Sequence, residues 1–327
     1  RLSLWFFLMA LVIELTGAAL LASRLIPRYG TARGLWLSLF TAVSAFCNAG
    51  FDLFGNGDSL LAFRQDPVVL WTLIGLIQLG GMGFAVILEL LRHRKSLGRL
   101  SLHTKLVLAV NGALLVGGSL AVFLLEGRNP ATLGREGMTL WDRVTGSVFQ
   151  AVTCRTAGFA AVRQDALNDS TKLISCLMML VGASPASTGG GIKTTTLLVL
   201  IMTVVSYMQS KNDVEIMKHK IDKLAVYRTL TVTLLSLTAV ILCFSVLYFT
   251  LPEDGRGVQC LFEAVSAFST AGLSAGITEI SGTPGRILLI ITMFIGRVGP
   301  VSLVLSMLVN SAKRKNIVYP DGQIIVG

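Results

Sequence analysis

The sequence predicts an all-α integral membrane protein that repeats one unit, two membrane spans joined by a short pore loop, around a single ion pore. Three observations predict this class. Hydrophobic residues make up 53% and charged residues 14% of the 327 residues, whereas a soluble domain carries about 25% charged residues. Six long apolar segments follow one another along the chain, and one short motif recurs three times between them.

Each apolar segment has the roughly 20 residues that a helix needs to cross the hydrocarbon core of a bilayer. The first segment is too long for a signal-peptide core and has no A-x-A-like cleavage site, so we expect it to remain as a span. We expect membrane spans near residues 2–23, 67–91, 104–125, 171–209, 228–251 and 285–311.

The net charge of +10 at pH 7 raises the question of a nucleic-acid partner. Basic residues of membrane proteins collect in cytoplasmic loops, however, and eight of the ten lysines fall in three predicted inner loops. We therefore expect contact with membrane lipid and no nucleic-acid partner. The eight are Lys95, Lys105, Lys211, Lys218, Lys220, Lys223, Lys313 and Lys315.

The recurring motif is small, polar and ends in Ala-Gly. It reads FTAVSAFCNAGF at 40–51, FQAVTCRTAGF with one residue fewer at 149–159, and FEAVSAFSTAGL at 262–273. Each copy lies between one apolar segment and the next. The unit is therefore span, short amphipathic segment, Ala-Gly turn and span, present three times. We expect the units to occupy residues 1–100, 101–212 and 213–312, followed by a cytoplasmic C-terminal tail at 313–327.

The short segment before each turn has about ten helix-compatible residues, which are too few to cross a bilayer. We expect it to enter from the outer side and return, since non-helical backbone at membrane depth is tolerated only when it is buried in protein or lines a watery cavity. Glycine allows backbone conformations that let carbonyl oxygens face an axis, and rings of carbonyls can replace the hydration shell of potassium. The alternative is close helix packing through small residues; three copies in equivalent places favour the pore.

The second span of the second unit is interrupted by GASPASTGGGIK at 182–193. Proline removes a backbone donor and glycine weakens a helix interior, so we expect this span to break within the membrane, in a loop at 182–194. A phosphate-binding loop is disfavoured because Ile192 stands where glycine should precede the lysine. Two interpretations stay open, a movable gate and a passive kink.

Arg297 lies well inside the last apolar segment, where a charge is costly unless it faces water or a partner. We expect it to point inward. The alternatives are a buried pair with Glu14 or Glu89, or a side chain that reaches the membrane interface. Arg155, just before the second turn, either braces the turn through carbonyl contacts or reaches the outer surface.

These motifs together resemble the membrane subunit of the Trk/Ktr/HKT potassium transporter superfamily, nearest to its bacterial Ktr type. The resemblance rests on Asn48-Ala49-Gly50-Phe51, on the 152–159 string VTCRTAGF, on Ser269-Thr270-Ala271-Gly272-Leu273-Ser274 and on Gly189-Gly190-Gly191-Ile192-Lys193-Thr194. It implies four such repeats around one pore, a filter glycine from each repeat, and a gate formed by the interrupted loop and the arginine. The implied filter residues are Asn48, Ala49, Gly50, Thr156, Ala157, Gly158, Thr270, Ala271 and Gly272, and the implied gate residues are Ser187, Thr188, Gly189, Gly190, Gly191, Lys193 and Arg297.

Only three of the family's four repeats are present, and we expect the missing one to be the first, at the N-terminal side. In the plant branch of the family, serine at the first-repeat glycine accompanies sodium preference. The three glycines present favour potassium, and passage of sodium, or of both ions, stays open.

The resemblance implies potassium uptake across the cell membrane of a bacterium by a homodimer, which rests on a cytoplasmic regulatory ring that binds nucleotide. This chain shows no motif for a cofactor and no catalytic arrangement, so we do not expect an enzyme. The second function class is a secondary carrier coupled to another ion. Repeats of one topology favour the pore over that carrier.

Overall fold

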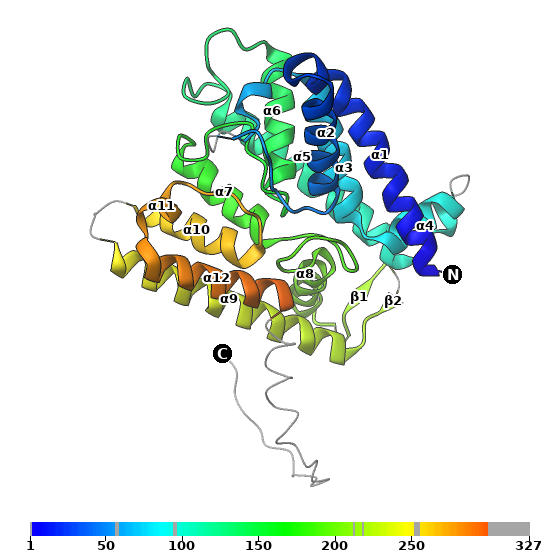
Figure 1. The fold of residues 1–327 in the computed structure, drawn as a ribbon. Helices are drawn as coiled ribbons and strands as arrows, with labels where there is room; N and C mark the ends of the chain where they lie inside the picture. The colour runs from blue at the N-terminus through cyan, green and yellow to red at the C-terminus, as the bar shows by residue number, and fades with distance from the viewer. Residues whose placement is uncertain are drawn as a thin grey trace.

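The computed structural model describes residues 2–55, 59–93, 97–211, 213–217, 219–251 and 256–299, which fold almost entirely as helices (Figure 1). The expected tail at 313–327 and the end of the last expected span lie outside the described residues. The α-helices are α1 Leu2–Tyr29, α2 Thr31–Phe46, α3 Pro67–Met82, α4 Phe84–Arg92, α5 Leu102–Glu126, α6 Leu140–Thr153, α7 Asp169–Leu180, α8 Thr194–Met208, α9 Lys223–Thr250, α10 Gly257–Ser269, α11 Ile277–Ile280 and α12 Gly282–Val298. Two 3-10 turns are Leu61–Phe63 and Leu97–Arg99, and the strands β1 Glu215–Ile216 and β2 His219–Lys220 form an antiparallel hairpin.

Three helices, α1, α5 and α9, are each long and apolar enough to cross a membrane. Helices α3 and α4 would add a fourth crossing if the pair is one broken span. The two helices meet at an angle of 99°. The span expected at 67–91 is thus broken by a sharp bend between α3 and α4. The interruption of 171–209 is confirmed, because α7 ends at Leu180 and α8 begins at Thr194.

The bend between α3 and α4 lies at Gly83, whose φ of 91° and ψ of 138° are outside the helical region. Gly299 has nearly the same conformation at the end of α12, with φ 89° and ψ 129°. Such backbone is open to glycine and strained for other residues, so it ends a helix sharply. Sequence reasoning missed both breaks, although Gly80 and Gly81 stand just before Gly83 and a proline follows Gly299 in the sequence.

The three motif segments form the short helices α2, α6 and α10, of 16, 14 and 13 residues. They are longer than the ten or so residues expected but still too short to cross a bilayer. The start of α6 carries a capping box, in which Thr139 and Asp142 satisfy each other's backbone N–H groups. Toward their C-terminal ends all three helices are almost fully buried.

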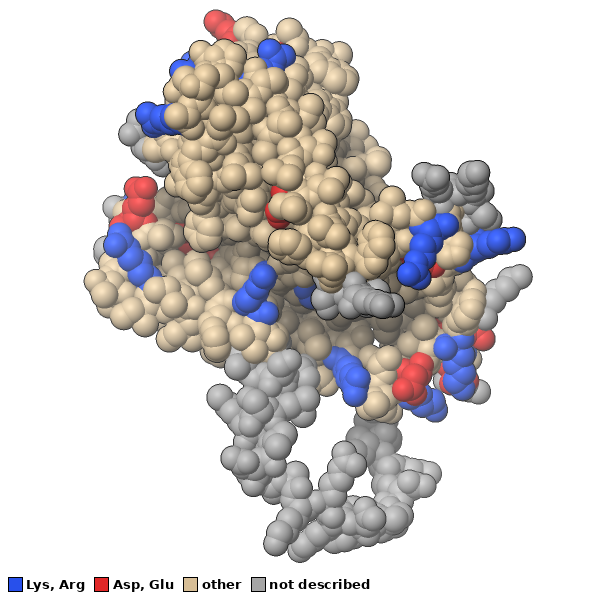
Figure 2. All heavy atoms as spheres, turned by 45° about the vertical axis from the view of Figure 1, so that its right-hand side comes forward, with Lys and Arg blue, Asp and Glu red and all other residues tan. Residues whose placement is uncertain are grey.

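The helices form three neighbouring groups (Figure 1). Helices α1, α2 and α3 pack together, α5 packs on α6 and α7, and α9, α10 and α12 form the third group, with α10 also against α7. Large apolar side chains such as Trp5, Leu124 and Leu234 are exposed on the long helices. The face in Figure 2 is mostly free of charge, as expected for a surface in contact with lipid.

Candidate functional site

The three motif turns, residues 48–50, 156–158 and 270–272, have one backbone conformation. In each turn the first residue and the glycine have positive φ, and the alanine between them does not. Positive φ is uncommon outside glycine, and threonine in particular avoids it because its branched Cβ crowds the backbone. The φ values are 48° at Asn48, 66° at Thr156 and 54° at Thr270, then 74° at Gly50, 83° at Gly158 and 80° at Gly272.

The three turns lie against one another. A Cβ atom added to Gly50 would come within 2.6 Å of the carbonyl oxygen of Ala157 and 2.9 Å of the Cα of Gly158. One added to Gly158 would come within 2.6 Å of the carbonyl oxygen of Ala271 and 3.5 Å of the Cα of Gly272. Two reasons therefore require glycine at both Gly50 and Gly158. The backbone has positive φ, and the neighbouring turn leaves no space for a Cβ atom.

Helices α2, α6 and α10 end at these turns, so the partial negative charge of three helix C-termini gathers there. Glycines of the neighbouring helices permit this close approach. Gly80 of α3 packs on the carbonyl of Phe46, and Gly296 of α12 packs on the carbonyl of Phe268. No other residue type would fit at Gly80 or Gly296 without moving one of the helices.

A cavity of about 560 Å³ opens on the outer side of the three glycines. Its wall includes the carboxylates Asp52, Asp165 and Glu279. Hydrogen bonds from the Arg163 guanidinium hold the pKa of Asp165 below its usual value, so this carboxylate stays ionised at neutral pH. Carboxylates around a water-filled mouth raise the local concentration of cations.

The 182–194 loop lies on the inner side of the turns. Its ends are joined by backbone hydrogen bonds, from Gly182 N to Ile192 O at 2.9 Å and from Ile192 N to Leu180 O at 3.1 Å. Gly189 packs against the side-chain hydroxyl of Thr156, and Gly190 packs against that of Thr270. The triple glycine thus lets the loop approach the turns directly.

Thr188 ties the same loop to the first unit. Its hydroxyl donates to the carbonyl of Phe46 or of Gly80, each at 3.2 Å, and its N–H donates to Gly80 O at 3.4 Å. Ser187 donates to the carbonyl of Ser184 within the loop, at 2.5 Å. The loop is therefore held in place by polar contacts and not by apolar packing alone.

Two cations hold consecutive carbonyls of this loop. Arg297 Nη1 donates to Thr188 O at 2.7 Å, and Lys193 Nζ donates to Gly189 O, also at 2.7 Å. Both side chains line a cavity of about 210 Å³ beside Gly190 and Gly191. The alternative pairing of Arg297 with Glu14 or Glu89 is wrong, because no such ion pair occurs in the described part of the chain.

Both interpretations of Arg155 are wrong. The side chain is 5% exposed, so it does not reach the outer surface. It donates to the side-chain oxygen of Gln78 on α3 at 3.4 Å and not to a carbonyl of the turn. It therefore links α6 to α3 behind the turn.

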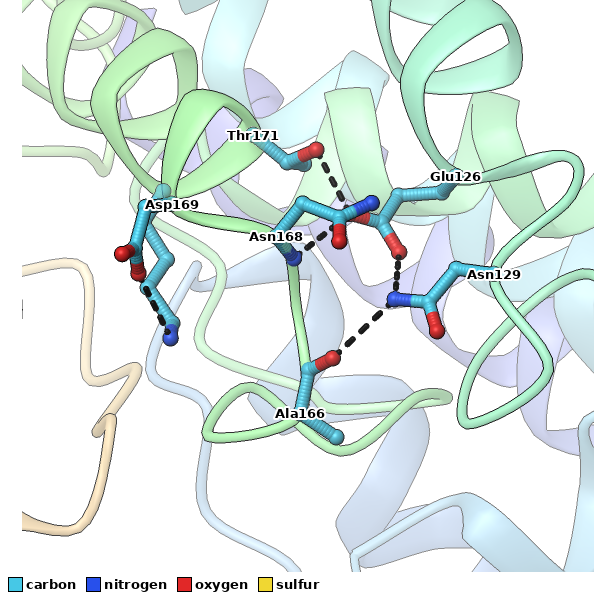
Figure 3. A network of polar contacts seen from close by, with 7 residues as sticks. Glu126, Asn129, Ala166, Asn168, Asp169 and Thr171 are labelled. Atoms are coloured by element: carbon cyan, nitrogen blue, oxygen red, sulfur yellow. Dashed lines mark hydrogen bonds and ion pairs between the residues drawn. The ribbon is translucent and has the colours of Figure 1, made fainter.

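Buried carboxylates and amides around the site were missed by sequence reasoning. Glu126 is fully buried and accepts hydrogen bonds from Asn129, Asn168 and Thr171, which point toward it in Figure 3, and from Thr132. It thereby joins the end of α5 to the start of α7. Gln150 and Glu263 bind the outer loops of the second and third units, and their shared position in the motif was the signal available.

The fold and the site define an α-helical membrane protein in which short buried helices aim their carbonyl ends at one point between longer helices. A family model described as "TrkH: Cation transport protein" matches residues 3–317. The chain belongs to this cation transport family, whose members are integral proteins of the cell membrane.

Three bacterial relatives match almost the whole chain. Ktr system potassium uptake protein B of Bacillus subtilis is 39% identical over 98% of this chain and 70% of its own length. The protein of the same name from Vibrio alginolyticus is 37% identical over 97% and 68%. Potassium/sodium uptake protein NtpJ of Enterococcus hirae is 35% identical over 100% and 72%.

The crystal structure of the potassium transporter TrkH from Vibrio parahaemolyticus has the same fold, with a TM-score of 0.69. The match covers 93% of this chain and 63% of that one, at 13% sequence identity. At this identity the likeness concerns the fold alone.

Proposed function

We propose that this chain forms most of a gated, channel-like pore for potassium uptake, in which carbonyls of residues 48–50, 156–158 and 270–272 form the selectivity filter. The observation that carries the proposal is the packing of three turns of one conformation at the ends of three helices. Fixed carbonyls at such a point can replace the water around a potassium ion. The names of the bacterial relatives support potassium as the ion.

The proposed gate is the 182–194 loop together with Lys193 and Arg297. The loop lies against the inner side of the turns, and two positive charges are fixed beside it. Positive charge close to a narrow path raises the energy of a passing cation. A displacement of the loop and of Arg297 would remove both the steric and the electrostatic barrier.

A passage for sodium as well as potassium is the second candidate, favoured by the name of the Enterococcus relative, a potassium/sodium uptake protein. A filter of three described turns needs a further contribution to close around an ion, and we propose that the family's first repeat supplies it. The serine or glycine at that position would then influence the choice between the two ions.

We further propose a homodimer that works with a cytoplasmic, nucleotide-binding ring. The surfaces we propose for this contact are the basic inner loops, which hold Lys211, Lys220 and Lys223, and the tail from Lys313 onward. Removal of residues 316–327 should reduce capture of the full-length protein by the purified ring. Unaltered capture would count against contact through the tail.

Uptake of rubidium and sodium by potassium-starved cells that express the full-length protein tests the pore. We expect selective rubidium uptake by the wild type, looser selectivity for Gly272→Ser and faster flux for Arg297→Ala. Gly75→Ser is the matched glycine control, because an added Cβ there meets nothing within 4 Å. Arg286→Ala is the arginine control on α12. Absence of any monovalent cation uptake by the wild type would refute the proposed function.

A further inference from the structure

We propose that three hydroxyls, those of Ser44, Thr153 and Ser266, set the outer end of the filter and thereby its ion selectivity. The inference rests on the proposed function and adds residues to its filter. All three belong to the last turns of α2, α6 and α10 and occupy the same position in the motif. We call them the brace hydroxyls.

Each brace hydroxyl donates to the carbonyl of the residue that directly follows a turn glycine. Ser44 Oγ donates to Phe51 O at 2.7 Å. Thr153 Oγ1 and Ser266 Oγ donate to Phe159 O and Leu273 O, both at 2.6 Å. The same contact therefore closes all three turns from behind.

A second hydrogen bond comes from the same three residues. Their backbone carbonyls accept from the N–H groups of the turn alanines. The distances are 2.9 Å from Ala49 N to Ser44 O, 3.1 Å from Ala157 N to Thr153 O and 2.9 Å from Ala271 N to Ser266 O. Each brace residue thus fixes its turn at two points, one on each side of the glycine.

The contact is not a by-product of sequence spacing. The second copy of the motif is one residue shorter, so Thr153 reaches a carbonyl six residues ahead, where Ser44 and Ser266 reach seven. The hydrogen bond is kept across this deletion at almost the same length. The three copies therefore share the geometry of the turn, although the number of residues between donor and acceptor differs.

The hydroxyl of a serine in a helix usually donates to the backbone carbonyl one turn back. Ser38 of α2 and Ser147 of α6 do this, with bonds of 2.7 Å to Gly34 O and to Arg143 O. The brace hydroxyls instead point forward and donate to a carbonyl of the following turn. The three residues are at most 5% exposed, so the hydroxyls themselves are shielded from water.

A carbonyl that points back at a buried hydroxyl behind its turn points away from the axis in front. The carbonyls of Phe51, Phe159 and Leu273 are therefore excluded from the row that lines the ion path, and the row ends at the glycines. Loss of a brace frees its carbonyl to rotate, because a buried acceptor without a donor is unfavourable. The spacing of oxygens around the ion then becomes variable, and a variable cage discriminates less between ions of different size.

The test compares Thr153→Val, which keeps the shape and removes the hydroxyl, with Thr153→Ser, which keeps the hydroxyl. The readout is the ratio of rubidium to sodium uptake by the full-length protein, normalised to the amount in the membrane. We expect a roughly tenfold lower ratio for Thr153→Val and a change within about twofold for Thr153→Ser. Ser147→Ala on the same helix is the control that loses only a bond to the preceding turn.

An unchanged ratio in Thr153→Val, with an active wild type, would overturn the brace and leave the pore standing. An inactive wild type would overturn the pore and the brace with it. If Thr153→Val fails to reach the membrane, Ser266→Ala decides on the same ratio, with Ser269→Ala as its control, since Ser269 donates to Val265 one turn back. The brace would also be refuted if Ser147→Ala lowered the ratio of rubidium to sodium uptake as much as Thr153→Val, or Ser269→Ala as much as Ser266→Ala.

Discussion

The first and third units fix their turns alike but treat the loops outside them differently. Three residues before the brace hydroxyl, α2 has Thr41 and α10 has Glu263. Glu263 accepts hydrogen bonds from Ser274 Oγ at 2.8 Å, Ala275 N at 3.2 Å and Thr278 N at 3.0 Å, and from the Thr278 hydroxyl. Thr41 is 1% exposed, and its hydroxyl has no partner in the described part of the chain.

The loop of the first unit is held by the second unit instead. Leu60 N donates to Ala160 O at 3.0 Å, and Ala160 N donates to the hydroxyl of Ser59 at 3.2 Å. In the second unit itself, Gln150 and Gln164 exchange hydrogen bonds of 2.8 and 3.0 Å. The position three residues before the brace residue therefore holds a glutamate anchor, an amide anchor or none, while the turn beside it keeps the same conformation.

The largest effect on stability is expected from Glu263→Ala. The change leaves the N–H groups of Ala275 and Thr278 without an acceptor, and each buried unpaired donor costs about 1 to 3 kcal/mol. We expect a clear fall in the melting temperature of the purified protein and a smaller fall for Glu263→Gln, whose amide oxygen still accepts. Glu279→Ala, an exposed position of the same loop, is the control. Equal melting temperatures for Glu263→Ala and wild type would show that Glu263 does not stabilise the outer loop of the third unit.

An intermediate effect is expected from Gln150→Leu, which leaves Gln164 buried with an unpaired carbonyl oxygen, at a cost of about 1 to 3 kcal/mol. The double change Gln150→Leu with Gln164→Leu should recover part of this loss, since no amide of the pair then stays unpaired. Thermal unfolding of the two single variants and the double variant measures the coupling. Strictly additive losses would mean that the amides do not act as a pair.

The smallest effect is expected from Thr41→Val. It replaces an unpartnered hydroxyl by a methyl group of the same shape, so stability should stay within about 0.5 kcal/mol or rise. The same melting measurement checks it. A loss of stability as large as that of Gln150→Leu would show that Thr41 also anchors a loop. The first unit would then not differ from the other two at this position.

Much of this arrangement could be predicted from the sequence because the motif recurs. Composition and apolar length were sufficient to predict the helical membrane class. The proline and the three consecutive glycines within 182–193 were sufficient to predict a broken span. The recurrence of Ala-Gly also directed attention to three segments that the structure brings together around Gly158. Their roles as filter and gate stay predictions.

The rest depends on contacts between distant segments. The bend at Gly83 follows from the loop that packs there, since an added Cβ would come within 2.6 Å of Pro185 O. The contact of Arg155 with Gln78 joins residues 77 positions apart. Positive φ at Thr156 contradicts local preference and is imposed by the turn around it. No single-sequence pattern reports such contacts.

The three turns lie in one polypeptide, and this has a consequence for how the pore can change over evolutionary time. In a ring of identical subunits every substitution enters all positions at once. Here a substitution enters one, so the equivalent places Thr41, Gln150 and Glu263 are free to diverge separately. A shared ancestral motif can thus acquire a glutamate anchor in one unit and an amide anchor in another, while all three turns keep the same backbone conformation.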